Sequence, residues 1–201
     1  MAFKKLLAAA GLGNMRVDAR LDSAEVAVGE HVTGELVVDG GLVAQDVRSL
    51  TVVLCADGRK TDDGTAVPVT LATATFDEAF TQRARQRRRV RFSLPVPVGT
   101  PPAMTERPAP VYVASGADVE LAVDPDDHDP VTVRPAPVHG QTVAVLRELG
   151  YSLDGEAVLR TRDGLLQELT FTPISGNGVG VEVAFVPAAD GGLDLIVDQQ
   201  L

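Results

Sequence analysis

The chain has 201 residues, with 28 acidic and 18 basic side chains, a formal net charge of −10, no tryptophan and a single cysteine. An acidic chain is poorly suited to bind nucleic acid through its overall field, and a single thiol excludes an intramolecular disulfide. Because aromatic residues make up 4% of the chain, its core must be built from Val, Leu and Ala, which suit β-sheets.

The first residues are predicted to form an N-terminal helical segment, 1–16. Lys4 and Lys5 precede an apolar run at 6–12, which is far shorter than the roughly 20 residues of a membrane span. The segment is expected to be a helix docked on the body. The alternatives are an amphipathic helix that binds a membrane surface or a partner, and an export signal, although no clear cleavage site follows the run.

Alternation of apolar and polar residues with a period of two predicts antiparallel strands from residue 17 onwards. The clearest example is 17–41, where a first run ends at Asp22, Gly29-Glu30 makes a turn, and a second run alternates strictly. The inward positions of that second run are Val32, Gly34, Leu36 and Val38. This pattern is typical of a pair of half-buried strands.

Further strands are expected in the same part of the chain, at 47–56, 67–76, 87–96, 111–123 and 131–133. A polar turn is expected at 57–65, and the five prolines of 97–110 exclude regular pairing there. Pro68 places its strand at a sheet edge or at a strand start. Strands at this spacing, without helices between them, indicate an antiparallel β-sandwich over 17–134.

The pattern changes near Pro135 and Pro137, which predict a domain junction. Helical spacing follows over 138–149, and Gly150 stands where a C-terminal cap is expected. Strands are then expected at 167–172, 179–186 and 193–198, the last two joined as a hairpin. Residues 138–201 hold nine acidic residues and three arginines, so they are predicted to form a smaller, acidic, β-rich lobe.

The densest run of basic charge is at 83–91, where every odd position is arginine. In an extended strand these side chains share one face, opposite Val90 and Phe92. Such a stripe suits an acidic protein surface, anionic lipid headgroups or phosphates, but no aromatic residues are interleaved for base stacking. Alternatively, it solvates an outer sheet face or pairs with the acidic second lobe. The residues predicted to contact a protein partner are Arg85, Arg87, Arg89 and Arg91.

No metal, cofactor or catalytic site is predicted. The acidic loop at 124–129 could hold a hard cation, but it lacks the glycine and the final acid of a calcium loop, and Asp-Pro turns explain its acids. His31, His128 and His139 show no metal-ligand spacing. Cys55 lies in an apolar strand, which favours a packed thiol over a nucleophile.

Short motifs that follow in order along nearly the whole chain carry a family resemblance. They include Phe3-Lys4-Lys5-Leu6, Val28-Gly29-Glu30-His31-Val32-Thr33-Gly34, Ala122-Val123-Asp124-Pro125, Glu148-Leu149-Gly150-Tyr151, Gln167-Glu168-Leu169-Thr170-Phe171-Thr172-Pro173 and Glu182-Val183-Ala184-Phe185-Val186-Pro187. The set resembles the stage-zero sporulation-control protein M (SpoOM) family. The resemblance implies a mainly β, arrestin-like fold of two antiparallel β-sandwich lobes, the second smaller and with one short helix. It also implies a cytoplasmic protein without known enzymatic activity.

The expected function is therefore that of a non-enzymatic regulatory or adaptor protein, which acts by protein–protein interaction in bacterial developmental, cell-division or stress control. The alternative is a peripheral membrane-surface protein that docks through its N-terminal helix and its arginine stripe. Lone edge strands also allow a homodimer by sheet pairing.

Overall fold

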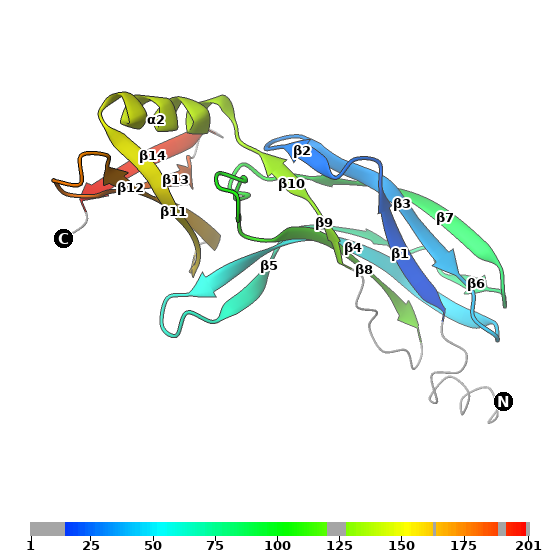
Figure 1. Ribbon diagram of the computed structural model, residues 1–201. Helices are drawn as coiled ribbons and strands as arrows, with labels where there is room; N and C mark the ends of the chain where they lie inside the picture. The colour runs from blue at the N-terminus through cyan, green and yellow to red at the C-terminus, as the bar shows by residue number, and fades with distance from the viewer. Residues whose placement is uncertain (1–14, 120–127, 163, 189–191, 200–201) are drawn as a thin grey trace.

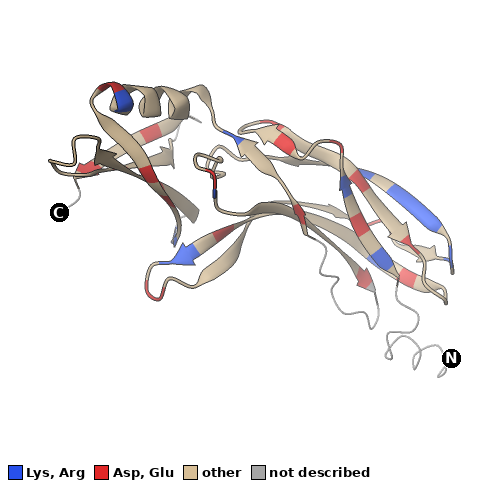
Figure 2. Ribbon diagram, viewed as in Figure 1, with Lys and Arg blue, Asp and Glu red and all other residues tan. Residues whose placement is uncertain are grey.

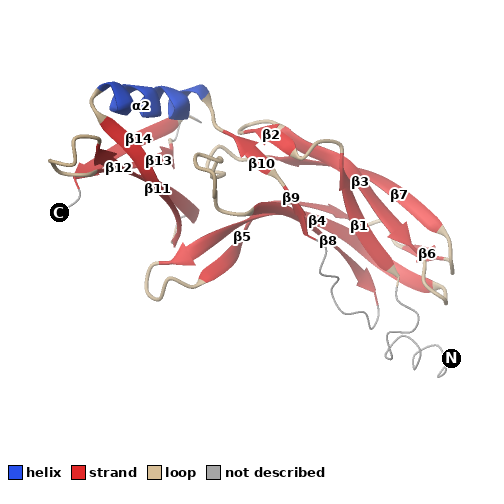
Figure 3. Cartoon of the chain, in the orientation of Figure 1, coloured by secondary structure: helices blue, strands red, loops and turns tan. Residues whose placement is uncertain are grey.

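The computed structural model describes residues 15–119, 128–162, 164–188 and 192–199, and these are mostly strand (Figures 1 and 3). The first part of the chain holds β1 (Arg16–Leu21), β2 (Glu25–Ala27), β3 (His31–Asp39), β4 (Gln45–Lys60), β5 (Ala66–Phe76), β6 (Phe80–Gln82), β7 (Arg87–Pro95), β8 (Val111–Val119), β9 (His128–Pro130) and β10 (Thr132–Arg134). The second part holds α2 (Pro137–Glu148), β11 (Tyr151–Thr161), β12 (Gly164–Pro173), β13 (Val181–Pro187) and β14 (Leu193–Gln199). The two parts form a larger and a smaller lobe of an elongated body, with β6 and β14 toward opposite ends (Figure 1).

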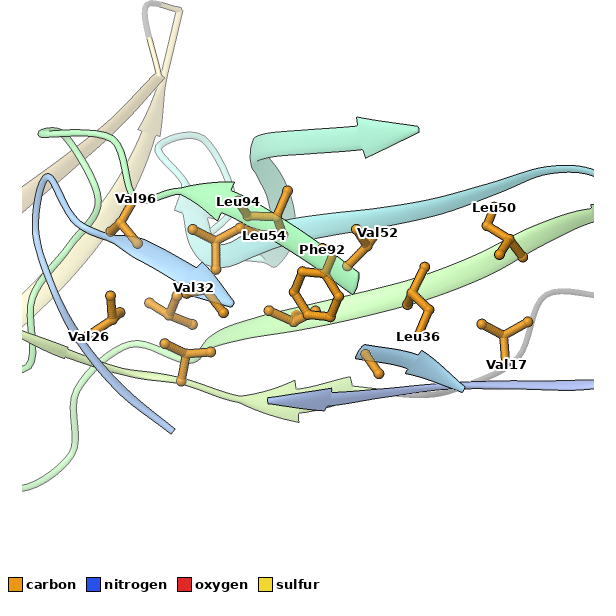
Figure 4. Close-up of a cluster of buried hydrophobic side chains, with 14 of the residues drawn as sticks. Val17, Val26, Val32, Leu36, Leu50, Val52, Leu54, Phe92, Leu94 and Val96 are labelled. Carbon is orange, nitrogen blue, oxygen red and sulfur yellow. The ribbon is translucent and has the colours of Figure 1, made fainter. Parts of the chain in front are cut away.

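The larger lobe is a β-sandwich. Its first sheet has the order β1-β3-β7, and its second sheet is built on β4, which pairs with β5, β6 and β8, with β9 beyond β8. Because side chains alternate across a strand, every second residue points between the two sheets. The buried residues of this core include Val17, Val26, Val32, Leu36, Leu50, Val52, Leu54, Phe92, Leu94 and Val96 (Figure 4).

The strand pair predicted at 17–41 is present as β1 and β3, which pair antiparallel. Gly34 of β3 stands opposite Leu21 of β1 on one side and opposite Phe92 of β7 on the other. A Cβ atom on Gly34 would lie 2.8 Å from Cζ of Phe92. The glycine therefore provides space for the phenylalanine ring within the sandwich.

Strand β7 shows the predicted alternation, with Phe92 and Leu94 buried in the strand and Val96 buried directly after it. Among the described residues, β5 pairs with β4 alone and is an edge strand, as Pro68 predicted. The alternation in β7 is predictable because one face of a strand is buried and the other is exposed. The edge position of β5 is predictable because proline lacks the backbone N–H that a central strand must donate.

Strand β4 is longer than the sequence predicts. The predicted turn at 57–65 is wrong for 57–60, which continue β4, and the turn occupies 61–65. Arg59 and Lys60 pair in parallel with Leu159 and Arg160 of β11. Polar residues adopt strand here because a neighbouring strand offers its backbone groups. This pairing links the two lobes in one nine-stranded sheet. Seven of its strands have the order β14-β13-β12-β11-β4-β8-β9, and β5 and β6 also pair with β4.

Helix α2 forms where helical spacing predicts it. Pro137 takes a first helical position, and the chain leaves the helix at Leu149 and Gly150, whose φ is +89°. The helix packs on the antiparallel strands β11–β14, so this smaller lobe consists of strands with one short helix, as predicted. The core between them is formed by Leu169, Phe171, Val183 and Phe185 of the sheet with Val143 and Leu146 of α2.

Strand β11 has no counterpart among the predicted strands. Its register against β12 shifts between Leu153 and Gly155, which is the mark of a β-bulge. The extra residue reverses which side chains face the core. A strict period of two therefore fails over 151–161, although the segment is paired with β12 on both sides of the bulge.

The proline-rich segment at 97–110 contains no strand, and its side chains and backbone join the two lobes. Gln167 of β12 donates from Nε2 to the carbonyl oxygen of Pro102 at 2.8 Å and to Oε1 of Glu156 at 2.9 Å. Thr105 Oγ1 donates to Oε2 of Glu156 at 3.0 Å. These hydrogen bonds add a polar contact between the lobes to the pairing of β4 with β11.

The predicted N-terminal helical segment, 1–16, lies outside the described residues up to residue 14. Arg16 belongs to β1, so the strand begins within the range predicted as helical. The predicted junction at 135–137 connects β10 to α2.

A histidine is buried between α2 and the sheet of the smaller lobe. His139 is 2% exposed, and its ring centroid lies 4.3 Å from that of Phe185. Nδ1 lies 3.3 Å from the carbonyl oxygen of Ala136, which accepts a hydrogen bond. Burial lowers the pKa of His139 and outweighs the opposite effect of this hydrogen bond.

We predict that this histidine makes the free energy of unfolding fall as the pH drops through about 6.5, the usual pKa of an unfolded histidine. Below that pH the unfolded chain binds a proton that the folded chain excludes until its own lower pKa is reached. Urea unfolding at about pH 7.5 and about pH 5.5 measures the effect in the wild type and in His139→Phe, which keeps a ring against Phe185. An equal loss in both proteins would contradict the prediction.

Candidate functional site

An arginine ladder runs along the outer face of the first sheet and consists of Arg87, Arg89 and Arg91 of β7. Basic residues colour much of this strand in Figure 2. Arg87 Nε donates to Oδ1 of Asp39 at 2.6 Å, and Arg91 Nη2 donates to Oδ2 of Asp22 at 2.6 Å. These hydrogen bonds lower the pKa of both carboxyl groups. Both acids belong to the larger lobe, so these arginines pair beside their own sheet and not with the acidic smaller lobe.

The middle of the arginine ladder covers an apolar residue. Arg89 Nη1 lies 3.4 Å from Oε2 of Glu35. In the strand register Val37 stands opposite Arg89 on one side and Asp18 on the other. Val37 is 0% exposed although it does not belong to the cluster of the sandwich core. Its cross-strand neighbour Arg89 is placed to cover it with an apolar stem while the charged end reaches water. The ladder is thus a mixed-charge outer face.

Arg85 does not belong to the ladder. The expectation that it shares the strand face is wrong, because it lies in the turn between β6 and β7 with a φ of +57°. Its backbone N–H donates to the carbonyl oxygens of Gly40 and Gly41, at 3.1 and 3.0 Å. Arg88 points to the other face of β7, where its guanidinium carbon lies 4.0 Å from the centroid of the Phe80 ring.

The acidic loop predicted at 124–129 lies outside the described residues up to residue 127. His128 and Asp129 belong to β9, and the His128 ring centroid lies 4.6 Å from that of Tyr112. In the part of the chain that the structure describes, no three His, Cys, Asp or Glu side chains gather as metal ligands.

The single thiol is packed, as predicted. Cys55 is 6% exposed, and its Sγ lies 4.0 Å from Oγ1 of Thr70. Burial raises the pKa of the Cys55 thiol. The group is therefore protonated at neutral pH and is a poor nucleophile.

A shallow groove of about 460 Å³ lies on the larger lobe beside the proline-rich segment. Its walls include Pro101, Pro108, Pro110, Tyr112, Val131 and Val133. The Tyr112 hydroxyl donates to Oδ1 of Asp57 at 3.4 Å, and burial raises its pKa, so the phenol stays neutral. These walls suit contact with apolar groups better than acid–base chemistry.

Exposed apolar side chains gather on the smaller lobe. Of the nine large hydrophobic residues that are exposed in the described chain, eight lie between residues 138 and 197. Five of them lie on α2 and near the turns of the sheet: Val138, Val145, Leu149, Ile174 and Val179. The other three are consecutive in β14: Leu195, Ile196 and Val197. These residues lie on more than one face of the lobe, and exposed apolar side chains in such number suit contact with another molecule.

The sequence pattern does not predict this apolar surface. Residues 193–198 are predicted as a strand, but that prediction assigns one face to a core and the other to water. The available signal is the run of three apolar residues at 195–197, which makes both faces of the strand apolar.

The predicted N-terminal helix, on which the alternative membrane-surface function depends, lies outside the described residues up to residue 14. Within the described residues, no helix is both long enough and apolar enough to cross a membrane.

Comparison with known proteins finds relatives along nearly the whole chain. A model of the SpoOM protein family (Spo0M) matches residues 3–199. The sporulation-control protein spo0M of Bacillus subtilis (strain 168) is 29% identical over 181 residues, which cover 87% of this chain and 69% of that protein. The crystal structure of Spo0M from Bacillus subtilis matches with a TM-score of 0.81 at 25% identity, covering 93% of this chain and 80% of that chain. With the arrestin-like fold implied by the resemblance thus confirmed, the chain belongs to the SpoOM protein family.

Proposed function

We propose that the chain is a non-enzymatic regulatory or adaptor protein that binds a protein partner in the cytoplasm, in developmental, cell-division or stress control of a bacterium. Membership of a sporulation-control family supports the regulatory role. The observation that carries the mode of action is the apolar surface of the smaller lobe, which holds eight of the nine large hydrophobic side chains exposed in the described part of the chain. A partner protein that covers this surface gains free energy from its burial.

The arginine ladder, with Arg85 beside it, is the second surface that we propose for partner contact. Arg87 and Arg91 are engaged with Asp39 and Asp22, so a partner must compete with short hydrogen bonds inside the larger lobe. Charged groups in such a setting affect orientation and partner choice more than affinity. We therefore propose the smaller lobe as the main contact and the ladder as an orienting surface.

Quantitative co-purification from the native cell tests the proposal. We expect Val145→Ser/Leu149→Ser on α2 to reduce recovery of the specific partner, because it removes exposed apolar surface without changing the core. Arg87→Glu/Arg89→Glu is expected to have a smaller effect that fades with salt. The control is Leu42→Ser, since Leu42 is 59% exposed on the larger lobe. Equal recovery by the α2 variant and the control, both folded by circular dichroism, would contradict the proposal.

A further inference from the structure

Strand β14 forms an open edge of the nine-stranded sheet. Among the described residues it pairs with β13 alone, so the backbone groups of its other edge face no strand. Edge strands commonly carry charged residues, especially lysine, or proline or a covering segment, which hinder pairing with another chain. The charged residues of β14 are Asp194 and Asp198, which hinder pairing with an acidic strand but not with a basic one. The sequence of β14, LDLIVDQ, has neither lysine nor proline, and its residues from 194 to 199 are exposed.

Both faces of this edge offer apolar contacts. Leu195 and Val197 lie on the α2 side of the sheet, because they stand opposite Phe185 and Val183 of the core. They are 46% and 58% exposed, so α2 does not cover them. Ile196 lies on the opposite face and is 53% exposed. A strand placed beside β14 would therefore bury apolar side chains above and below the sheet.

Acidic side chains flank the apolar segment symmetrically. Asp194 and Asp198 stand two positions before and after Ile196 and on the same face. Glu182 of β13 stands opposite Asp198. The pKa of Glu168 on β12 is raised by burial and, to a smaller extent, by the negative charge of Glu182. Residues 164–199 contain no lysine or arginine. This face of the sheet is consequently negative where it meets the open edge.

A second copy of this chain is a poor occupant of the edge. Antiparallel self-pairing centred on Ile196 would place Asp194 directly opposite Asp198 of the second copy, and this contact would occur twice. Like charges that face each other on neighbouring strands destabilise the pair. Charge therefore favours a strand that brings basic residues to these two positions.

We propose that β14 accepts an extended segment of a protein partner as a further strand, and that this segment carries two basic residues separated by three apolar ones. The basic side chains pair with Asp194 and Asp198, and the middle apolar residue covers Ile196. Backbone hydrogen bonds supply affinity, and the alternating side chains supply the choice of partner. This inference rests on the proposed function, because it names the partner chemistry of one surface of the smaller lobe.

Titration of the full chain with the capped fluorescent peptide Thr-Lys-Val-Ile-Val-Lys-Thr tests the inference, beside a matched peptide in which both lysines are glutamates. We expect the wild type to bind the lysine peptide at least about tenfold more tightly. In Asp194→Lys/Asp198→Lys the preference is expected to reverse. The matched control Asp77→Lys/Glu78→Lys changes the charge equally in an exposed loop of the larger lobe and is expected to keep the wild-type preference.

Four results would overturn the inference. The first is no saturable binding of either peptide by the wild type, and the second is an unchanged lysine preference in Asp194→Lys/Asp198→Lys. The third is undiminished binding of a lysine peptide with a central proline, which cannot pair as a strand. A wild-type dimer in sedimentation that dissociates in Ile196→Asp would place a second copy at the edge and would also overturn it.

The two proposals fail in different ways. If partner capture persists and depends on Val145 and Leu149 while the peptides do not bind, the strand addition at β14 is wrong and the proposed function stands. If the wild type captures no specific partner in the cell, the proposed function itself is wrong, whatever the peptides do.

Discussion

Phe171→Ala is expected to lower the free energy of unfolding by about 3–5 kcal/mol. Phe171 is 1% exposed in β12, where it stands between Leu153 of β11 and Val181 of β13. Loss of the ring leaves a cavity, and a small core has few neighbouring side chains that can move to fill it. The buried residues of this core are Leu169, Phe171, Val183 and Phe185.

Urea unfolding followed by circular dichroism measures the loss, with Ile174→Ala as the matched control. Ile174 is 64% exposed, so its truncation is expected to change the free energy of unfolding by no more than about 0.5 kcal/mol. Limited proteolysis of Phe171→Ala is expected to cut the smaller lobe before the larger one. A loss below about 1 kcal/mol would mean that the ring is not central to the core of this lobe.

Gly34→Ala is expected to destabilise the larger lobe by about 1–3 kcal/mol, although it adds a single methyl group. A Cβ atom at this position would contact the carbonyl oxygen of Arg20 and lie 2.8 Å from Cζ of Phe92. The carbonyl belongs to β1, which is paired with β3 along its length, and Phe92 is 4% exposed in the sandwich core. Neither neighbour can move without loosening the packing. This close approach explains the glycine of the family-like motif at 28–34.

Gly140→Ala is the matched control for Gly34→Ala, and it is expected to raise the free energy of unfolding instead of lowering it. Gly140 lies in α2, and an added Cβ there would meet no other part of the chain within 4 Å. Alanine is favoured over glycine inside a helix by about 0.5–1 kcal/mol. Thermal unfolding of the two variants should therefore shift in opposite directions. A shift of the same sign in both would rule out steric crowding as the reason for Gly34.

Local pattern is sufficient to predict those elements whose environment differs cleanly between their faces. Strands β3 and β7 each have a face in the sandwich core, so alternation identifies them and their inward residues. Helix α2 is predictable from its spacing and from Pro137 and Gly150 at its ends. Strand β11 cannot be predicted from the sequence pattern, because the bulge after Leu153 shifts the alternation of apolar and polar residues. Residues 57–60 cannot be predicted in this way, because their strand depends on pairing with β5 and, at Arg59 and Lys60, with β11 of the other lobe.

For the candidate surfaces, the sequence by itself determined that positions 87, 89 and 91 share one outward face, since strand periodicity is a local property. Only the tertiary structure decided that acids of the same lobe pair with these arginines, because the register of β1, β3 and β7 brings together residues far apart in the chain. In the same way, β14 is open because of its place at the end of the sheet order and not because of its residues alone. Periodicity determines which side chains share a face, whereas strand order and register, which depend on the packing of distant segments, decide what covers that face.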